Sequence, residues 1–267
     1  MSNKNDFPTV EELSNGFSEF KKESTKDLLG TSVTLNYENG SNVIYTFLDE
    51  ECMKASYSKD GQEEAYACIY TAVSPREGIY LVDFIEDHGL SQSITTVIDK
   101  NLGIATTMRA QLPTREEADV SQLVRAMNNM PMTSVKAEYL HAAVDAPFTD
   151  TTKKHEFTKE LIGKHVRFRY SSNDTYEHIY LNDKYYTWHC VSGIENGLCD
   201  TDRCYYIKLA ENLYWFTWLE KVVPTIGTVI EDLSPEVMRS YGKLAGYDSY
   251  DHGKITNFQV GSYATEL

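Results

Sequence analysis

The stretch Glu160–Tyr170, ELIGKHVRFRY, repeats the pattern of an earlier stretch, Asp27–Tyr37, DLLGTSVTLNY. An acid, a leucine, a glycine, a valine and a tyrosine stand at matching places in both. Further matches follow in the same order. GIYLVDFIED, with Tyr80, Phe84 and Glu86, lies over LYWFTWLEKV, with Tyr214, Trp218 and Glu220, and SITTVIDKNLGIATTMRAQL parallels TIGTVIEDLSPEVMRSYGKL. Repetition over such a length indicates two copies of one structural unit in tandem.

Each half consists of short runs of β-branched and aromatic residues that alternate with polar ones. Turn signals such as Glu38-Asn39-Gly40, Asn182-Asp183 and Asn196-Gly197 separate these runs. This pattern is typical of successive antiparallel strands. The sequence therefore predicts an all-β protein of two tandem antiparallel β-barrels related by internal duplication.

One helix is predicted, from Arg115 to about Met130, because Pro113-Thr114 opens it and Pro131 follows it. Its apolar stripe is expected to cover an open barrel end, and the stripe consists of Leu123, Met127 and Met130. The polar, turn-rich segment 143–157 predicts the domain boundary near residue 150. The expected domains are 1–150, with the helix 115–130, and 151–267, with the ligand pocket.

Composition limits the class of function. The chain has 267 residues and a net charge of −15, which disfavours binding to nucleic acid or to an anionic membrane surface. It has no apolar run of the ~20 residues that a spanning helix needs, and its charged start does not resemble a signal peptide. We expect a cytoplasmic protein with free thiols. The sequence leaves open whether the chain forms a homo-oligomer.

In the second half, alternation places bulky aromatic side chains on one face of each strand. Along Tyr214–Lys221, YWFTWLEK, one face carries three aromatic rings and then Glu220. A carboxylate in such a place is costly to enclose unless it is paired or used. If these faces line the barrel, they form a small-molecule pocket. The predicted ligand-binding residues are Phe168, Tyr180, Tyr186, Trp188, Tyr214, Phe216 and Trp218.

Three polar residues on the same faces are the predicted catalytic groups. Glu220 would act as a general acid or base, with Tyr170 and His178 as its hydrogen-bonding partners. Each role has a structural alternative. Glu220 would then be a strand-end acid paired with Lys221 or Arg203, and His178 would be a core histidine.

The first half carries the matching acid at Glu86, but its inward positions are smaller and more aliphatic. Its barrel is therefore expected to have a filled core. The sequence predicts no metal site, because the neighbours His189 and Cys190 point to opposite sides of a strand and no C-x-x-C pair is present. No cofactor is predicted.

Several motifs resemble the molybdenum cofactor biosynthesis protein F (MoaF) family. The most specific are TWHC at 187–190, DTDRC at 200–204 and EKVVP at 220–224. VEELSNGF and LLGTSVTLNYENG resemble the N-terminal half of that family. The resemblance covers nearly the whole chain. It implies a pair of calycin-type, lipocalin-like barrels and, through the family name, a link to molybdenum cofactor biosynthesis.

The second half is also similar, more weakly, to the phenolic acid decarboxylases. These are calycin barrels that use two tyrosines, an arginine and a glutamate. The resemblance places the glutamate at Glu220 and one tyrosine at Tyr170, whereas Phe168 and Leu198 replace the other tyrosine and the arginine. Three functions stay open. They are a lyase or isomerase acting on a small aromatic or hydroxylated metabolite, a non-catalytic binder of such a molecule, and an accessory protein that binds a partner.

Overall fold

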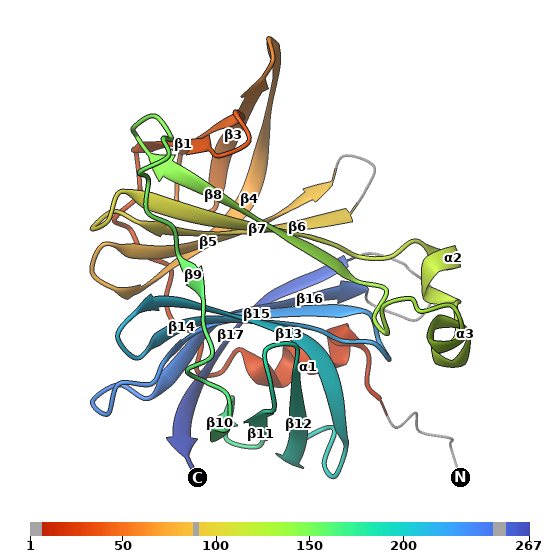
Figure 1. Ribbon diagram of the computed structural model, residues 1–267. Helices are drawn as coiled ribbons and strands as arrows, with labels where there is room; N and C mark the ends of the chain where they lie inside the picture. The colour runs from red at the N-terminus through yellow and green to blue at the C-terminus, as the bar shows by residue number, and fades with distance from the viewer. Residues whose placement is uncertain (1–6, 88–90, 248–254) are drawn as a thin grey trace. The chain divides into compact units, whose positions relative to one another are not determined.

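The computed structural model describes residues 7–87, 91–247 and 255–267 and contains two closed antiparallel β-barrels of eight strands each (Figure 1). This confirms the all-β prediction and the tandem barrels. None of the helices in these ranges is long and apolar enough to cross a membrane.

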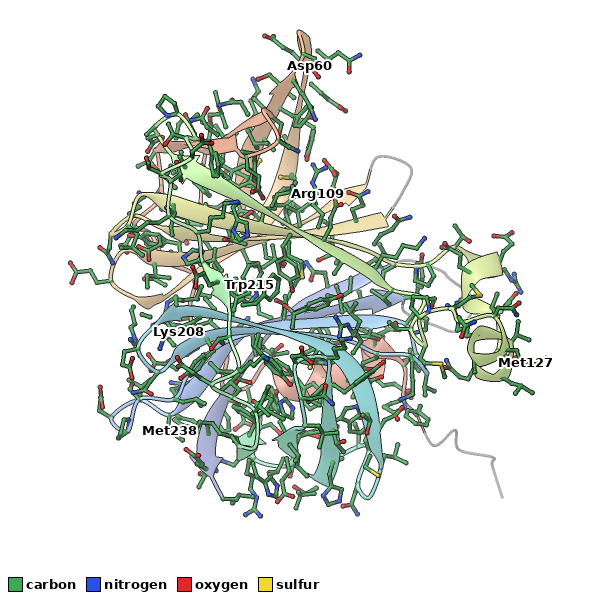
Figure 2. All side chains as sticks on the ribbon, viewed as in Figure 1. Asp60, Arg109, Met127, Lys208, Trp215 and Met238 are labelled. Atoms are coloured by element: carbon green, nitrogen blue, oxygen red, sulfur yellow. The ribbon has the colours of Figure 1, made fainter. Side chains whose placement is uncertain are left out.

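The first barrel is a meander in which each strand pairs with the next and β1 closes the ring with β8. Alternation builds its core, because every second residue of β1 and β2 is buried. A two-residue turn at Asp60-Gly61, with positive φ at both residues, joins β3 to β4 (Figure 2). The strands are β1 (Ser32–Tyr37), β2 (Asn42–Phe47), β3 (Cys52–Lys59), β4 (Gln62–Arg76), β5 (Ile79–Asp87), β6 (Ser91–Asp99), β7 (Ile104–Gln111) and β8 (Lys136–Val144).

The second barrel repeats this topology, with β10 closing on β17 and the long strand β13 pairing with both β12 and β14. A short additional strand, β9 (Glu156–Phe157), pairs with β13 outside the ring order. The strands of the ring are β10 (His165–Arg169), β11 (Thr175–Tyr180), β12 (Tyr185–Ser192), β13 (Cys199–Ala210), β14 (Leu213–Leu219), β15 (Thr225–Asp232), β16 (Arg239–Tyr247) and β17 (Ile255–Glu266).

The duplication is visible in individual contacts. Tyr37 and Tyr170 each donate the backbone N–H across the next turn at 2.9 Å, to the carbonyls of Ser41 and Asp174. The hydroxyl of Tyr80 donates to Asp27, and Tyr214 makes the matching bond to Glu160 in the other copy. These repeated tyrosines therefore occupy equivalent places in the two barrels. The third match is displaced by one residue, because the sequences set Ile94 over Ile226, whereas Ile94 pairs with Phe84 as Gly227 pairs with Trp218.

The chain forms two compact units that interleave along the sequence. One contains the first barrel, residues 23–111 and 137–155. The other contains the second barrel from Glu156 onward, together with the residues up to Lys22 and the segment 112–136. The boundary near residue 150 thus lies between the strands of the two barrels, while the helical segments group with the second one.

A helix absent from the sequence prediction, α1 (Val10–Phe17), belongs to the second unit. Thr9 caps it, with Glu12 in a reciprocal capping box. Its buried residues, Val10, Leu13 and Phe17, lie on one stripe, and Leu13 and Phe17 join the core of the second barrel. The T-x-x-E motif before this stripe was the available sequence signal.

The predicted helix 115–130 is instead two short helices, α2 (Arg115–Ala118) and α3 (Gln122–Met127). Ser121 is the N-cap of α3, because its hydroxyl accepts the backbone N–H of Val124. A new helix therefore begins there, and α2 does not continue into α3. Buried Arg125 then donates to the carbonyls of Glu117, Val120, Pro131 and Thr133 and so holds the segment together.

The stripe predicted to cover a barrel end does not do so. Leu123 and Met127 are 70% and 74% exposed, and Met130 is also exposed. Figure 2 shows Met127 on the outer side of α3. The expectation was wrong because the long side chain of Arg125, not the apolar stripe, supplies the buried contacts of α3.

Candidate functional site

The interior of the second barrel contains all ten residues that the sequence analysis assigned to a site. The nine aromatic and histidine side chains are each at most 6% exposed, and Glu220 is half-buried. The nine are Phe168, Tyr170, His178, Tyr180, Tyr186, Trp188, Tyr214, Phe216 and Trp218. The structure therefore brings these residues to one interior.

That interior is almost full. The void beneath α1 has a volume of about 30 Å³ and is lined by Tyr170, His178, Trp188 and Glu220, among others. Phe17 closes it from the helix, with its ring centroid 5.0 Å from that of Tyr170. This volume suits one or two water molecules rather than a metabolite.

Glu220 lies at the edge of this void. Its Oε1 accepts the Trp218 indole N–H at 2.9 Å, and its carboxyl group is enclosed by protein. Burial raises the pKa of Glu220 well above its usual value, and the nearby carboxylates of Asp202 and Glu195 raise it further. Lys221 pairs with Asp200 and Asp202 rather than with Glu220.

The two predicted partners of Glu220 lie around the same void without bonding to it. Burial lowers the pKa of His178 to about 3, so its ring is neutral. That ring packs 4.8 Å from the ring centroid of Phe168, and its Nδ1 has no hydrogen-bond partner in the described chain. Burial also raises the pKa of Tyr170. Among the described residues, no hydrogen bond joins any two of the three groups.

A second buried acid, Glu231, was missed. The hydroxyl of Tyr180, a predicted ligand-binding residue, donates to Glu231 Oε1 at 2.6 Å. Burial raises the pKa of Glu231 to about 8. The strand β15 is buried throughout its length, so alternation could not show on which side Glu231 lies.

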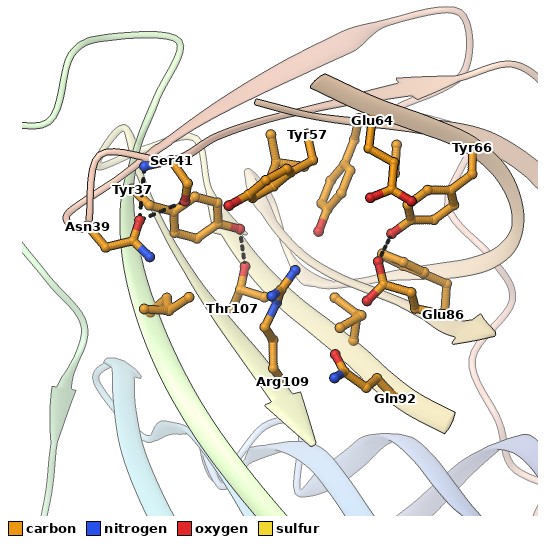
Figure 3. A pocket seen from close by; sticks show the side chains of 16 residues that line it. Tyr37, Asn39, Ser41, Tyr57, Glu64, Tyr66, Glu86, Gln92, Thr107 and Arg109 are labelled. Carbon is orange, nitrogen blue, oxygen red and sulfur yellow. Dashed lines mark hydrogen bonds between the residues drawn. The ribbon is translucent and has the colours of Figure 1, made fainter. Parts of the chain in front are cut away.

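The first barrel contains a larger cavity, of about 360 Å³ (Figure 3). The expectation of a filled core was wrong, and strand register gives the reason. Ala55 pairs across from Tyr45, whereas Trp188 pairs across from His178 at the same place in the second barrel. Likewise Val43 stands opposite Leu35 where Tyr176 stands opposite Phe168. The cavity thus lies where the second barrel has an indole and a phenol.

Arg109 on β7 reaches into this cavity (Figure 3). It is half-buried, and within the described ranges its side chain makes neither a hydrogen bond nor an ion pair. Its counterpart in the second barrel is Leu244, because Arg109 pairs with Ile94 as Leu244 pairs with Gly227. Glu64 and Glu86 also line the cavity, but neither forms an ion pair with Arg109 in the part of the chain that the structure describes. Its guanidinium group therefore has the chemistry to bind an anion.

Hydroxyl groups form one wall beside Arg109. The hydroxyl of Tyr37 lies 2.6 Å from the hydroxyl of Thr107. The Thr107 hydroxyl in turn lies 2.9 Å from the hydroxyl of Thr96. The hydroxyl of Tyr45 lies 3.2 Å from Thr96 and extends the chain. Burial raises the pKa of Tyr37 to about 12, although Thr107 and the Arg109 charge oppose the rise. These phenols are therefore neutral hydrogen-bonding groups at physiological pH.

Glu86, the repeat counterpart of Glu220, lines the cavity wall away from Tyr37 (Figure 3). The hydroxyl of Tyr66 donates a short hydrogen bond to its Oε1. Burial raises the pKa of Tyr66, and its carboxylate partner raises it further. In both barrels, therefore, the repeated acid accepts a hydrogen bond from an aromatic side chain.

Sequence reasoning located the acid pair but not the open cavity. Most of β7 is buried on both faces, so its pattern does not reveal Arg109 as an inward residue. The sequence match places Arg109 over Tyr241, and the leucine at the equivalent place of the second barrel, Leu244, becomes apparent only from the strand register.

Comparison with known proteins gives consistent results for both halves. Residues 5–114 match the model of the MoaF N-terminal domain, and residues 155–267 match that of the MoaF C-terminal domain. "Protein MoaF" of Klebsiella aerogenes is 37% identical over 198 residues, which is 74% of this chain and 73% of that protein. A solved structure, "Crystal Structure of a putative beta-lactamase from Burkholderia vietnamiensis", is 14% identical. It covers 41% of this chain and 97% of its own, with a TM-score of 0.34.

The two domain models together span most of the sequence, and the identity to the Klebsiella protein extends over nearly three quarters of both chains. The chain therefore belongs to the MoaF family.

Proposed function

We propose that the first barrel binds a small aromatic or hydroxylated metabolite that carries a negative charge. The observation behind this proposal is the unpaired Arg109 inside a cavity of about 360 Å³. Such a volume lies within the range of about 300–1,000 Å³ found for small-molecule sites. The guanidinium group offers a fork of donors that matches a carboxylate.

The rest of the cavity suits the other parts of such a ligand. Phe84, Ile94 and Val43 supply apolar walls for a ring, and Tyr37, Tyr57 and Ser41 supply hydroxyl groups for polar substituents. Because the whole protein has a net charge of −15, long-range electrostatics would not attract an anion. Arg109 therefore has to supply the local attraction.

Arg109→Leu is expected to weaken the binding of hydroxylated benzoates about tenfold, because one charge-assisted hydrogen-bonded pair is lost. Titration calorimetry with such a panel, and with the matching neutral benzyl alcohols, measures the effect. Ala55→Trp introduces the side chain that Trp188 has at the same place in the second barrel, and it should weaken the binding of acids and alcohols alike.

Arg115→Leu serves as the control, because it removes the same charge from an exposed position on α2. Equal affinity for acids and alcohols in the parent protein, or benzoate binding that survives Arg109→Leu unchanged, would refute the proposal.

A second candidate function is proton transfer in the second barrel by Glu220 with Tyr170 and His178, as in a lyase or isomerase. The raised pKa of Glu220 supports it, since a carboxyl group that keeps its proton to a higher pH than usual suits general acid–base chemistry. The small void requires that α1 move before a ligand enters.

For this candidate, Glu220→Gln should abolish any solvent-deuterium exchange or conversion of a bound metabolite, as followed by NMR in D₂O. Glu86→Gln is the matched variant, because it changes the equivalent acid of the first barrel. Full activity in Glu220→Gln, with loss of activity in Glu86→Gln, would move the chemistry to the first barrel.

A further inference from the structure

A groove on the second unit, separate from both barrel interiors, is formed by three segments of the chain. They are residues 157–159 at the end of β9, the turn at Asp183-Lys184 between β11 and β12, and residues 203–206 of β13. The groove has a volume of about 360 Å³, as large as the cavity of the first barrel. The function proposed above does not use it.

Backbone hydrogen bonds fix the walls of this groove. The N–H of Thr158 donates to the carbonyl of Tyr206 at 3.0 Å, which holds the first segment against β13. The N–H of Cys204 donates to the carbonyl of Lys184 at 2.9 Å, which holds the turn against the same strand. The groove is therefore formed before any ligand binds, so binding needs little ordering of the backbone.

The charge of the groove is opposite to that of the protein as a whole. Lys159, Lys184 and Arg203 line it, against one acid, Asp183. Within the described part of the chain, none of these three cations pairs with a carboxylate. Other cations of the same barrel do, as in the pair between Lys208 and Glu160 at 2.6 Å. Three uncompensated cations around one groove favour an anion of more than one charge.

The groove also offers aromatic surface next to these charges. The Arg203 guanidinium lies over the ring of Tyr205, 4.7 Å from its centroid. Phe157 is 57% exposed, and its ring centroid lies 6.4 Å from that of Tyr205. The guanidinium Nη1 of Arg203 is buried and has no hydrogen-bond acceptor among the described residues. A planar ring can stack on Phe157 while an anionic group meets the cations.

We propose that this groove binds a phosphate monoester attached to a planar ring, as in a nucleoside monophosphate or an aryl phosphate. The dianionic phosphate has oxygens for the ammonium groups of Lys159 and Lys184 and for the guanidinium of Arg203. The ring packs on Phe157, and a single carboxylate would leave part of the positive charge without a partner.

The test is calorimetric titration of the full chain at low salt with phenyl phosphate, AMP, inorganic phosphate and adenosine. Phenyl phosphate and AMP should bind more tightly than inorganic phosphate or adenosine, and added salt should weaken the binding. Arg203→Gln should weaken both monoesters about tenfold. Lys184 lies in an exposed turn that tolerates substitution, and Lys184→Gln should weaken the binding of both monoesters several-fold.

Phe157→Ala should remove the preference for phenyl phosphate over inorganic phosphate. Arg167→Gln is the control, because Arg167 is an exposed arginine of the same barrel that already pairs with Glu177. Phenyl phosphate is also an aromatic anion of the kind proposed for the first barrel, so the titrations are repeated on Arg109→Leu, and the monoester binding that persists in that variant belongs to the groove. Absence of saturable binding, or equal affinity in the parent protein and Lys184→Gln, would overturn the proposal.

Discussion

Gly227→Ala is expected to destabilise the protein by about 3 kcal/mol, because the second barrel has no space for the added methyl group. A Cβ at this position would lie 2.0 Å from Cε2 and Cζ2 of Trp218. The indole cannot simply move away. It stacks on Phe216 with a centroid distance of 5.3 Å, and its N–H donates to Glu220. Urea denaturation of the parent and the variant measures the loss.

The first barrel suggests a compensating change. Its counterparts of Trp218 and Gly227 are Phe84 and Ile94, so a smaller ring there accompanies a larger partner. Trp218→Phe combined with Gly227→Ala should therefore recover part of the stability that Gly227→Ala loses. The single variant Trp218→Phe measures how much stability the lost hydrogen bond to Glu220 costs, so that this loss can be subtracted. A Gly227→Ala variant as stable as the parent would show that the indole adapts.

Glu231→Gln is expected to stabilise the protein at pH 8, because the buried carboxyl group of Glu231 resists ionisation. Its pKa is about 8 in the folded protein against an ordinary value of 4.5. A raised pKa means that the folded state binds the proton more tightly. The stabilising contribution is thus fully present below pH 4.5 and is lost as pH rises to 8. By pH 7 the loss amounts to about 3 kcal/mol.

The amide of the Gln variant still accepts the hydrogen bond of Tyr180 but does not titrate, so its stability should change less between pH 5 and 8. Glu236→Gln is the control, because it removes a carboxylate at an exposed position. In the first barrel the apolar residues Phe47 and Ile98 occupy the places of Tyr180 and Glu231, so the same positions there hold no titratable group. Parallel stability–pH curves for the parent and Glu231→Gln would contradict the assigned pKa.

The fold was predictable because its signals are local and occur twice. Alternation placed Tyr170, His178 and Trp188 on inward faces, and the duplication showed that two barrels follow each other. The site was predictable only in part. Residues such as Glu86 and Glu220 recur visibly, but cavity volume depends on which side chains meet across strands. The difference between Ala55 and Trp188 acquires meaning only once the register is known.

Buried strands and distant contacts limited the rest. Where both faces of a strand are covered, as for β7 and β15, apolar residues occupy both parities and an inward Arg109 or Glu231 has no distinct pattern. The helix α1 has a clear capping motif, yet it packs on Tyr170 and Tyr176 and on β16 and β17, all of them more than one hundred and fifty residues later. No local rule identifies such partners.

The position of α1 has a consequence for how the protein is made. At translation rates of about 5–20 residues per second, the ribosome needs about 10–50 s to synthesise the chain between Phe17 and the strands β16 and β17. During that time the first barrel can close, since all its strands precede residue 145. Leu13 and Phe17 meanwhile lack the complete core that they will enter, and stay available to chaperones or to another nascent chain. Completing the second barrel therefore requires α1, which is among the first segments to be synthesised, to pack on strands that are synthesised last.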